Sequence, residues 1–167
     1  KANTEAMMVK VYGIDPTNIV SRHNYLTDMS QGNINPTRSL VDSYVMTDGL
    51  PIGKSPLYQT PAKSEDFFND RDIRLHTTVF KRGDPFNVGT PIFTTANFNF
   101  NSTGFVFKKY HNTEDPKTHP NSMIDRFVIR YAEILLNYAE AVYELGGSIS
   151  DVDLNKSINL LRSRAGI

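Results

Sequence analysis

The sequence contains no cysteine. This excludes disulfide bonds, thiolate metal sites and a thiol nucleophile within these 167 residues. No apolar run approaches the roughly 20 residues that a membrane-spanning helix needs. Net charge is also absent, because 18 basic residues balance 18 acidic ones, and the chain therefore has no bulk field to attract a polyanion. We expect no nucleic-acid partner.

Familiar catalytic motifs are missing as well. The chain has no Gly-x-Ser-x-Gly elbow, no His-Glu-x-x-His pair and no phosphate-binding glycine loop. A glycoside hydrolase needs only two suitably spaced carboxylates, which a chain with 18 acidic residues does not exclude. The conspicuous acids have structural interpretations, however, because Glu133 follows Arg130 by three residues and Glu140 lies on the polar side of a predicted helix. We expect a non-catalytic protein without a cofactor, and a hydrolase stays open as an alternative.

The sequence does contain a predicted helical hairpin over residues 130–167. Apolar residues recur in its first half at three- and four-residue spacing: Val128, Ala132, Leu135, Ala139 and Val142. Tyr131, Tyr138 and Leu145 widen this stripe. The pattern predicts a helix that is buried on more than one side.

Glycines and capping residues separate this helix from a second one. Gly146 and Gly147 suit the left-handed conformation that closes a helix, and Ser150, Asp151 or Asp153 can cap the next helix. The second helix is predicted from its apolar face and its basic last turn, which contain Leu154, Ile158, Leu161, Arg162, Arg164 and the closing Gly166.

Residues 138–146 have the aromatic, small and glycine spacing of a tetratricopeptide first helix. One such unit cannot bury its apolar face alone, and we find no second copy in the sequence. A tetratricopeptide-like protein-interaction scaffold is therefore one functional hypothesis, and the single copy counts against it.

Short elements and loops are predicted upstream of the hairpin. Residues 6–12 are apolar with a β-branched bias and predict a buried strand or the end of an element, whereas residues 14–39 are polar and predict a loop. We expect a short helix or strand over 40–46 before a turn at 47–51, a helix over 64–68 capped by Ser64 or Thr60, and strands over 75–80 and 105–107. The long helix is expected to begin near Arg130 after an extended approach.

Four neighbouring charges, Asp70, Arg71, Asp72 and Arg74, allow two interpretations. They form either a catalytic or metal cluster or a structural ion-pair network, and alternating opposite charges favour the network. Residues 111–119 hold two histidines and two acids, but their spacing matches no zinc pattern and favours a solvated loop. We expect no metal site.

The candidate ligand contacts are His23, Asn24, Tyr25, Asn97 and Phe98. An aromatic ring beside an amide on a loop suits a sugar, because the ring stacks on the pyranose while the amide bonds its hydroxyl groups. The alternatives also stay open: Tyr25 packs beneath its own loop, and the alternating Asn and Phe residues at 97–101 form an ordinary half-buried strand.

Several stretches together resemble the SusD/RagB family of surface nutrient-binding lipoproteins. They occur in the family's order and span most of the chain: LVDSYVMTDGL at 40–50, NDRDIRL at 69–75, TGFVFKKY at 103–110, RYAEILLNYAEA at 130–141 and LRSRAGI at 161–167. The resemblance implies a mainly α structure with irregular loops and a few short strands, as part of a SusD-like α-superhelical, tetratricopeptide-like fold. Residues 1–129 would form a loop-rich middle region, and 130–167 the signature hairpin.

The same resemblance implies a function. Members of the family capture glycan at the outer face of the Gram-negative outer membrane, without catalysis, and pass it to a SusC-like TonB-dependent transporter. A variant of the family captures peptides instead, and the residues do not decide between the two cargoes. Because family members are several times longer, we expect this chain to be an internal fragment whose lipid anchor, the only link to the membrane, lies outside it.

Overall fold

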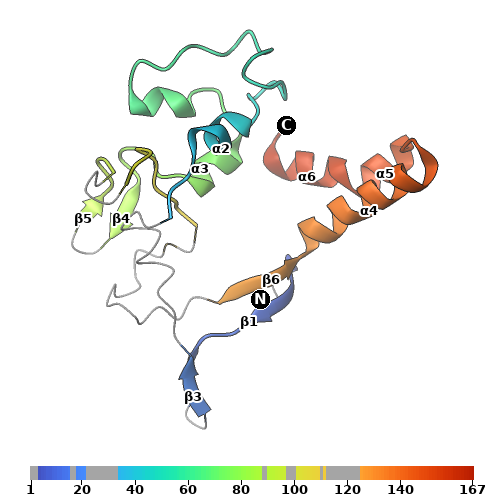
Figure 1. The fold of residues 1–167 in the computed structure, drawn as a ribbon, viewed down its shortest axis with the longest axis horizontal. Helices are drawn as coiled ribbons and strands as arrows, with labels where there is room; N and C mark the ends of the chain where they lie inside the picture. The colour runs from blue at the N-terminus through green and yellow to red at the C-terminus, as the bar shows by residue number, and fades with distance from the viewer. Residues whose placement is uncertain are drawn as a thin grey trace. The chain divides into compact units, whose positions relative to one another are not determined.

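The computed structural model describes residues 4–15, 18–21, 34–87, 90–96, 101–109, 111 and 125–167. Its contacts divide the chain into two compact units, Lys1–Ser21 with Ile124–Ile167, and Arg22–Met123. Figure 1 shows the helical hairpin of the first unit and the short helices of the second. Helices and irregular segments predominate over three short two-stranded sheets in the described part of the chain, which confirms the predicted mainly α class.

The first unit begins with a strand that leads to the hairpin. Strand β1 (Ala6–Lys10) lies antiparallel to β6 (Arg126–Arg130), with Ala6 opposite Arg130 and Lys10 opposite Arg126 (Figure 1). The predicted strand is therefore present, but its predicted burial is wrong, since Met7 is 60% exposed and Met8 is 55% exposed. The physical reason is that β1 has one neighbour, in a two-stranded sheet.

A second small hairpin follows β1 within the segment that was predicted to be a loop. Strand β2 (Gly13–Asp15) pairs antiparallel with β3 (Asn18–Ser21). The loop prediction for 14–39 is wrong here, because Ile19 and Val20 have the β-branched side chains that favour strands even in a polar segment. It is also wrong at the other end of the segment, where Thr37 caps a helix that begins at Arg38.

The long helix of the hairpin agrees with its prediction. Helix α4 (Tyr131–Gly146) starts directly after β6, so the extended approach to Arg130 is confirmed. Gly147 ends the helix at a φ of 67°, and its N–H donates to the Tyr143 carbonyl at 2.7 Å. Ser150 then caps α5 (Asp151–Lys156) by accepting a hydrogen bond from the Asp153 N–H.

The second half of the hairpin is two helices where the sequence predicted one. Helix α6 (Ile158–Ala165) follows α5 after a break at Ser157, and Gly166 ends it at a φ of 73°. The Ser157 side chain is fully buried, and its hydroxyl donates to the Asp153 carbonyl four residues earlier at 2.5 Å. Serine bonds of this kind compete with the helical backbone and bend helices, which explains the break.

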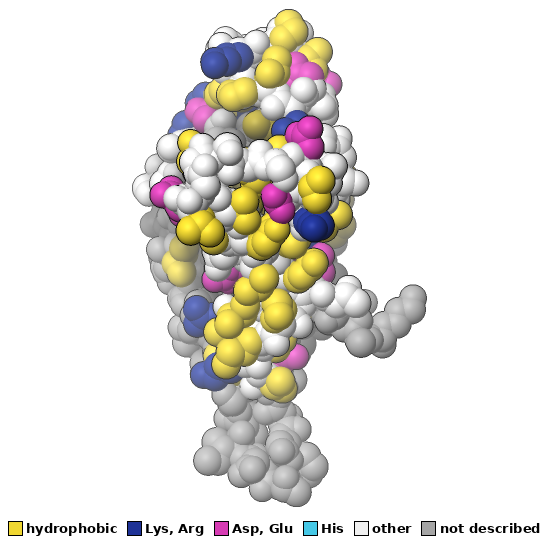
Figure 2. All heavy atoms as spheres, turned by 90° about the vertical axis from the view of Figure 1, so that its right-hand side faces the viewer, with side chains coloured by type: hydrophobic (Ala, Val, Ile, Leu, Met, Phe, Trp, Pro, Cys, Tyr) yellow, Lys and Arg dark blue, Asp and Glu magenta, His cyan; other side chains and the backbone are white. Residues whose placement is uncertain are grey.

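Only part of the apolar stripe of α4 is buried. Leu135 and Ala139 lie in the interior, whereas Tyr131 and Tyr138 are exposed and Leu145 is 93% exposed. Figure 2, viewed toward the end of the hairpin, shows apolar side chains at the molecular surface. The prediction of burial on more than one side is therefore met on one side only within the described residues.

The second unit is built around three short helices. Helix α2 (Arg38–Ser43), the 3-10 helix η1 (Ser64–Phe68) and α3 (Ile73–Thr78) supply most of one core cluster, whose buried members are Val41, Phe68, Leu75 and Val79. Full burial of each such side chain contributes about 1.5 to 3 kcal/mol. Between α2 and η1 the predicted turn is confirmed, because Asp48 accepts a hydrogen bond from the Leu50 N–H and Gly49 has a φ of 80°.

Residues 75–80 are mostly helix, so the predicted strand is wrong. Asp72 caps α3 by accepting a hydrogen bond from the Arg74 N–H at 2.8 Å, which starts a helix just ahead of the β-branched residues. The strand pattern survives in a single bridge between Val79 and Phe107. The strand predicted over 105–107 is likewise reduced to this bridge.

A second core cluster lies beside a short β-hairpin. Strand β4 (Pro85–Asn87) pairs with β5 (Thr90–Ile92), and the buried cluster contains Phe80, Phe93, Ala96 and Val106. His111 stacks on Phe86 with ring centres 5.1 Å apart and makes a short hydrogen bond with the Phe86 carbonyl. Across the described ranges, no helix combines the length and the apolar character needed to cross a bilayer.

Candidate functional site

The ligand contacts predicted from the sequence cannot be placed in this fold. His23, Asn24, Tyr25, Asn97 and Phe98 lie outside the described residues, as does most of the segment 111–119. Within the described residues, no three His, Asp or Glu side chains gather as a metal site would require. The contacts therefore stay predictions.

The second unit contains a pocket of about 400 Å³ that the sequence analysis did not identify. It is lined by Met46 and Arg71, by the irregular segment 57–61, and by Asp66, Phe67, Asn69 and Asp70. This volume lies within the range of small-molecule sites. We refer to it as the Arg71 pocket.

Arg71 connects the lining of the pocket to the end of α2. Its side chain is buried, and Nη2 donates to the carbonyl oxygens of Val41 and Tyr44 at 2.6 and 2.7 Å. These carbonyls end α2, where a positive charge is favoured. Burial lowers the pKa of Arg71, the nearby charge of Asp42 opposes that shift, and arginine remains charged in proteins.

The four charges at 70–74 do not act as one cluster. Asp72 is fully buried and pairs with Arg74 at 2.5 Å, a hydrogen bond that raises the pKa of Arg74. The structural ion-pair interpretation is thus confirmed for Asp72 and Arg74. Arg71 instead bonds backbone carbonyls, which a list of charges along the sequence could not indicate.

Asp70 differs from its neighbours because it lies in the left-handed region. Its φ is 52°, and it is the non-glycine residue with positive φ in the described part of the chain. Its carbonyl accepts a hydrogen bond from the Thr47 N–H at 2.8 Å, and the next residue, Arg71, bridges to Met46. The exposed carboxylate lines the pocket, and no hydrogen bond or ion pair within the described residues occupies it.

Asp66 also lines the pocket, but its carboxylate is already engaged. Oδ2 accepts hydrogen bonds from the N–H groups of Ala62 and Lys63, both at 3.1 Å. Asp66 therefore fixes the start of η1, and the predicted caps Ser64 and Thr60 are wrong. The Asp66 side chain thus bonds the backbone that precedes η1, whereas the Asp70 carboxylate is the more exposed of the two in the pocket lining.

Two aromatic rings line the pocket, and only one is available for stacking. The Arg38 guanidinium lies 4.5 Å from the centre of the Phe67 ring, and Phe105 meets that ring edge-on at 5.3 Å. Tyr58, the other ring that lines the pocket, is half-buried. The segment that carries it is held by Ser55, whose hydroxyl donates to Asp48 at 2.6 Å.

The chemistry of the Arg71 pocket therefore combines one aromatic face with polar groups of both kinds. Asn69 and Gln59 offer amide donors and acceptors, Thr60 offers a hydroxyl and Asp70 a carboxylate acceptor. Such a set matches a ligand with an apolar face and several hydroxyl groups. A second carboxylate for acid–base hydrolysis would have to be Asp66, whose bonds to Ala62 and Lys63 hold it in place.

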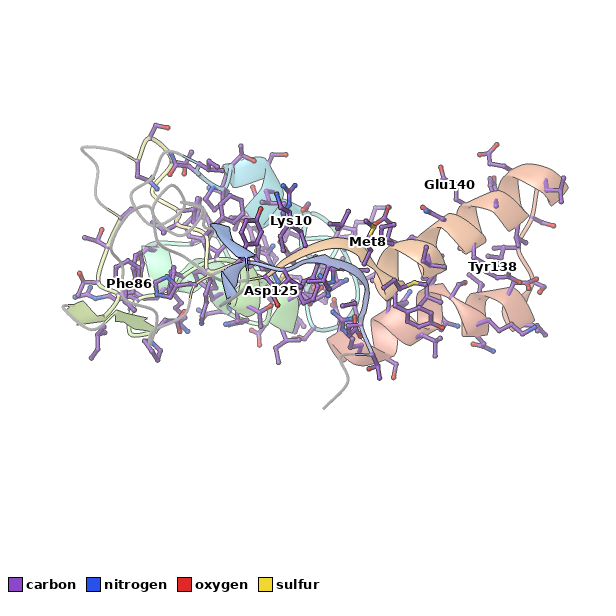
Figure 3. The ribbon with its side chains drawn as sticks, turned by 90° about the horizontal axis from the view of Figure 1, so that it is seen from below. Met8, Lys10, Phe86, Asp125, Tyr138 and Glu140 are labelled. Atoms are coloured by element: carbon purple, nitrogen blue, oxygen red, sulfur yellow. The ribbon has the colours of Figure 1, made fainter. Side chains whose placement is uncertain are left out.

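The first unit has a second, chemically different hollow. An apolar groove of about 360 Å³ lies between α4 and the start of α6, lined mainly by Leu136, Ala139, Tyr143, Ile149 and Ile158. Beside it the Tyr138 hydroxyl donates to Asp153 at 2.6 Å, and Figure 3 shows Tyr138 on the side of α4 toward α5. The groove offers few polar groups and does not resemble a sugar site.

Comparisons with known proteins agree with the fold. A model described as the SusD family matches residues 6–167. A solved SusD-like carbohydrate-binding protein from Bacteroides fragilis NCTC 9343 is 30% identical, with a TM-score of 0.61 over 80% of this chain and 28% of that one. A SusD-like protein from the same strain is 21% identical, with a TM-score of 0.66 over 98% of this chain and 36% of that one.

These two matches confirm the fold predicted from the sequence resemblance, and the second supports the fold alone because its identity is low. A search of curated proteins finds no match. The chain spans 28% and 36% of the lengths of the two solved structures, about a third of each.

Proposed function

The chain belongs to the SusD family, and from that premise we propose that the intact protein captures saccharides without modifying them. The observation that carries this proposal is the Arg71 pocket, whose lining contains both the Tyr58 ring and the polar side chains of Asn69 and Asp70. The neighbour described as carbohydrate-binding supports the same class of ligand. Stacking and hydrogen bonding at an open pocket predict modest affinity, because desolvation and ordering offset much of the contact energy.

The protein's place in the cell is a further part of this proposal. Family membership supports a location at the outer surface of the outer membrane, with attachment by a lipid and delivery of the saccharide to a SusC-like TonB-dependent transporter. Isolation of the intact protein from its native membrane tests this part. We expect the transporter to co-purify and surface protease to reach the protein in whole cells. A periplasmic or cytoplasmic location would contradict it.

A binding array tests the proposed cargo. The intact protein is applied to immobilised oligosaccharides and, in parallel, to a peptide library, which represents the alternative cargo. We expect saturable binding to one group of saccharides and recovery of those saccharides with unchanged mass. Binding to peptides alone would replace the glycan proposal, and shortened saccharides would show a hydrolase.

A further inference from the structure

Asp70 occupies a backbone conformation that costs free energy. A non-glycine residue at positive φ is uncommon, and it persists where the surrounding structure fixes it. Three contacts fix this segment: the Thr47 N–H to the Asp70 carbonyl at 2.8 Å, the Asp72 N–H to the Val45 carbonyl at 3.0 Å, and the bridge between Met46 and Arg71. Contacts of Asp70 itself and of the two residues that follow it thus hold the strained conformation, which lies in the lining of the pocket.

Arg71, in the lining of the same pocket, is held by backbone carbonyls. Arg71 is 5% exposed, and its guanidinium makes its two shortest hydrogen bonds to the carbonyls at the end of α2. Its Nε is buried without a hydrogen-bond partner in the described residues. The pocket lining therefore contains a buried cation whose Nη2 is already bonded to backbone, while its Nη1 makes a long bond of 3.4 Å to the Phe67 carbonyl. Among the charged side chains that line the pocket, Asp70 is exposed, Asp66 is half-buried and Arg71 is buried.

From this arrangement we propose that the Arg71 pocket is a subsite for one neutral sugar unit. The Tyr58 ring covers the apolar face of the pyranose, the Asp70 carboxylate accepts hydrogen bonds from neighbouring hydroxyl groups, and the Asn69 amide bonds a further hydroxyl. This inference rests on the proposed saccharide capture and adds its ligand class and its residues. Uronate and sulfated sugars are disfavoured, because two carboxylates, Asp66 and Asp70, line the pocket together with a single cation, Arg71.

A peptide fits the same pocket less well. Peptides are commonly held by the free edge of a strand or by a helix-binding apolar groove. Apart from the bridge between Met46 and Arg71, the lining of the Arg71 pocket consists of irregular or 3-10 segments, and its apolar residue Met46 is 1% exposed. The pocket therefore provides neither of these two modes of peptide recognition. It does provide an aromatic ring and polar side chains that can bond hydroxyl groups.

Calorimetric titration of the intact protein tests the subsite. The probes are neutral gluco-, manno-, galacto- and xylo-oligosaccharides, an oligogalacturonate and a sulfated oligosaccharide. Asp70→Asn removes the charge and keeps a residue type that tolerates the left-handed region, and Asp70→Gly removes the side chain and relieves the strain. Tyr58→Ala removes the ring. Glu133→Gln, an exposed acid on α4 of the other unit, is the matched charge-removal control.

We expect neutral saccharide binding to weaken about 10-fold or more in Asp70→Asn, Asp70→Gly and Tyr58→Ala, as the loss of a charge-assisted hydrogen bond or a stacking ring predicts. Glu133→Gln should bind saccharides as the wild type does. Asp70→Asn should reduce the difference in affinity between neutral and acidic saccharides. Wild-type affinity in all three folded pocket variants would overturn the subsite and leave saccharide capture standing. Failure of the wild type to bind any saccharide would overturn both, and a preference for acidic probes would overturn the neutral ligand class.

Discussion

At the scale of single residues, Arg71 links separate segments of the second unit. It is buried, and it bonds carbonyl oxygens of residues 27 and 30 positions earlier in the chain. A buried carbonyl without a partner costs about 1 to 3 kcal/mol. The residue therefore joins the end of α2 to the lining of the pocket.

Replacement of Arg71 by alanine should lower the free energy of unfolding by about 2 kcal/mol or more, because the Val41 and Tyr44 carbonyls lose their donor. Arg82→Ala is the control, since Arg82 is exposed and its ion pair with Glu65 is 3.5 Å long. That pair should contribute less than about 1 kcal/mol. Urea denaturation of the intact protein measures both. Equal losses in the two variants would contradict the anchoring role.

The interactions of Asp153 make the stability of the hairpin depend on pH. The hydrogen bonds from Ser150 and Tyr138 lower the pKa of Asp153, and the bond to Asp153 raises the pKa of Tyr138. A lowered carboxyl pKa contributes stability above its unfolded value of about 4 that is lost as the pH falls through the folded value. A raised tyrosine pKa contributes stability below about 10 that is lost as the pH rises through the folded value.

The hairpin should therefore be most stable between about pH 4 and pH 10 with respect to this pair. Asp153→Asn should reduce the loss of stability on the acid side of the profile. The control is Asp151→Asn, which changes an exposed acid two residues earlier and should keep the wild-type profile. Urea midpoints measured from pH 3 to pH 8 test this. An acid limb that persists in Asp153→Asn would show that other carboxyl groups control it.

At the scale of elements, the sequence predicted those whose signals are local. The spacing of Leu135 and Ala139, the glycine at 147 and the serine at 150 each act within a few residues, and the structure confirms α4 with both of its boundaries. Residues 75–80 failed because their Thr and Val content favours a strand, while Asp72 supplies a helix cap whose effect outweighs it.

The end of α4 offers a matched pair of glycines. Gly147 has a φ of 67°, where alanine is strained by about 1 to 2 kcal/mol, and a Cβ at Gly146 meets no atom within 4 Å. We expect Gly147→Ala to lower the melting temperature and Gly146→Ala to raise it slightly, because alanine is favoured by about 1 kcal/mol inside a helix. Thermal denaturation distinguishes them. The reverse order would mean that the helix closes one residue earlier.

The helix at 73–78 buries one of its two large aliphatic side chains and exposes the other, so their substitutions should differ in effect. Leu75 is fully buried in the first core cluster, and Ile73, one half-turn earlier, is 60% exposed. Leu75→Ala should cost about 2 to 5 kcal/mol through the cavity that it leaves. Ile73→Ala should cost under about 1 kcal/mol, since this side chain keeps most of its contact with water in the folded state. Chemical denaturation of both variants is the measurement, and comparable losses would contradict the observed face.

At the scale of the whole molecule, the fold class was predictable and the candidate site was not. The family's stretches carry architecture, and the structure places NDRDIRL at the Arg71 pocket as an anchor for α2. Pocket residues such as Tyr58 and Asp70 line one pocket from separate irregular segments, which no periodic spacing in the sequence indicates. The tetratricopeptide-like scaffold gains no second repeat, because α4 with α5 and α6 is the single hairpin of this kind in the described part.

The central claim is that the intact protein binds a neutral saccharide and releases it unchanged. Equilibrium dialysis against a neutral oligosaccharide chosen from the array, followed by mass analysis of the ligand on both sides of the membrane, measures binding and cleavage in one sample. We predict excess saccharide on the protein side, with its mass unaltered after prolonged incubation. Equal concentrations on both sides for every saccharide, or the appearance of shorter products, would contradict the account.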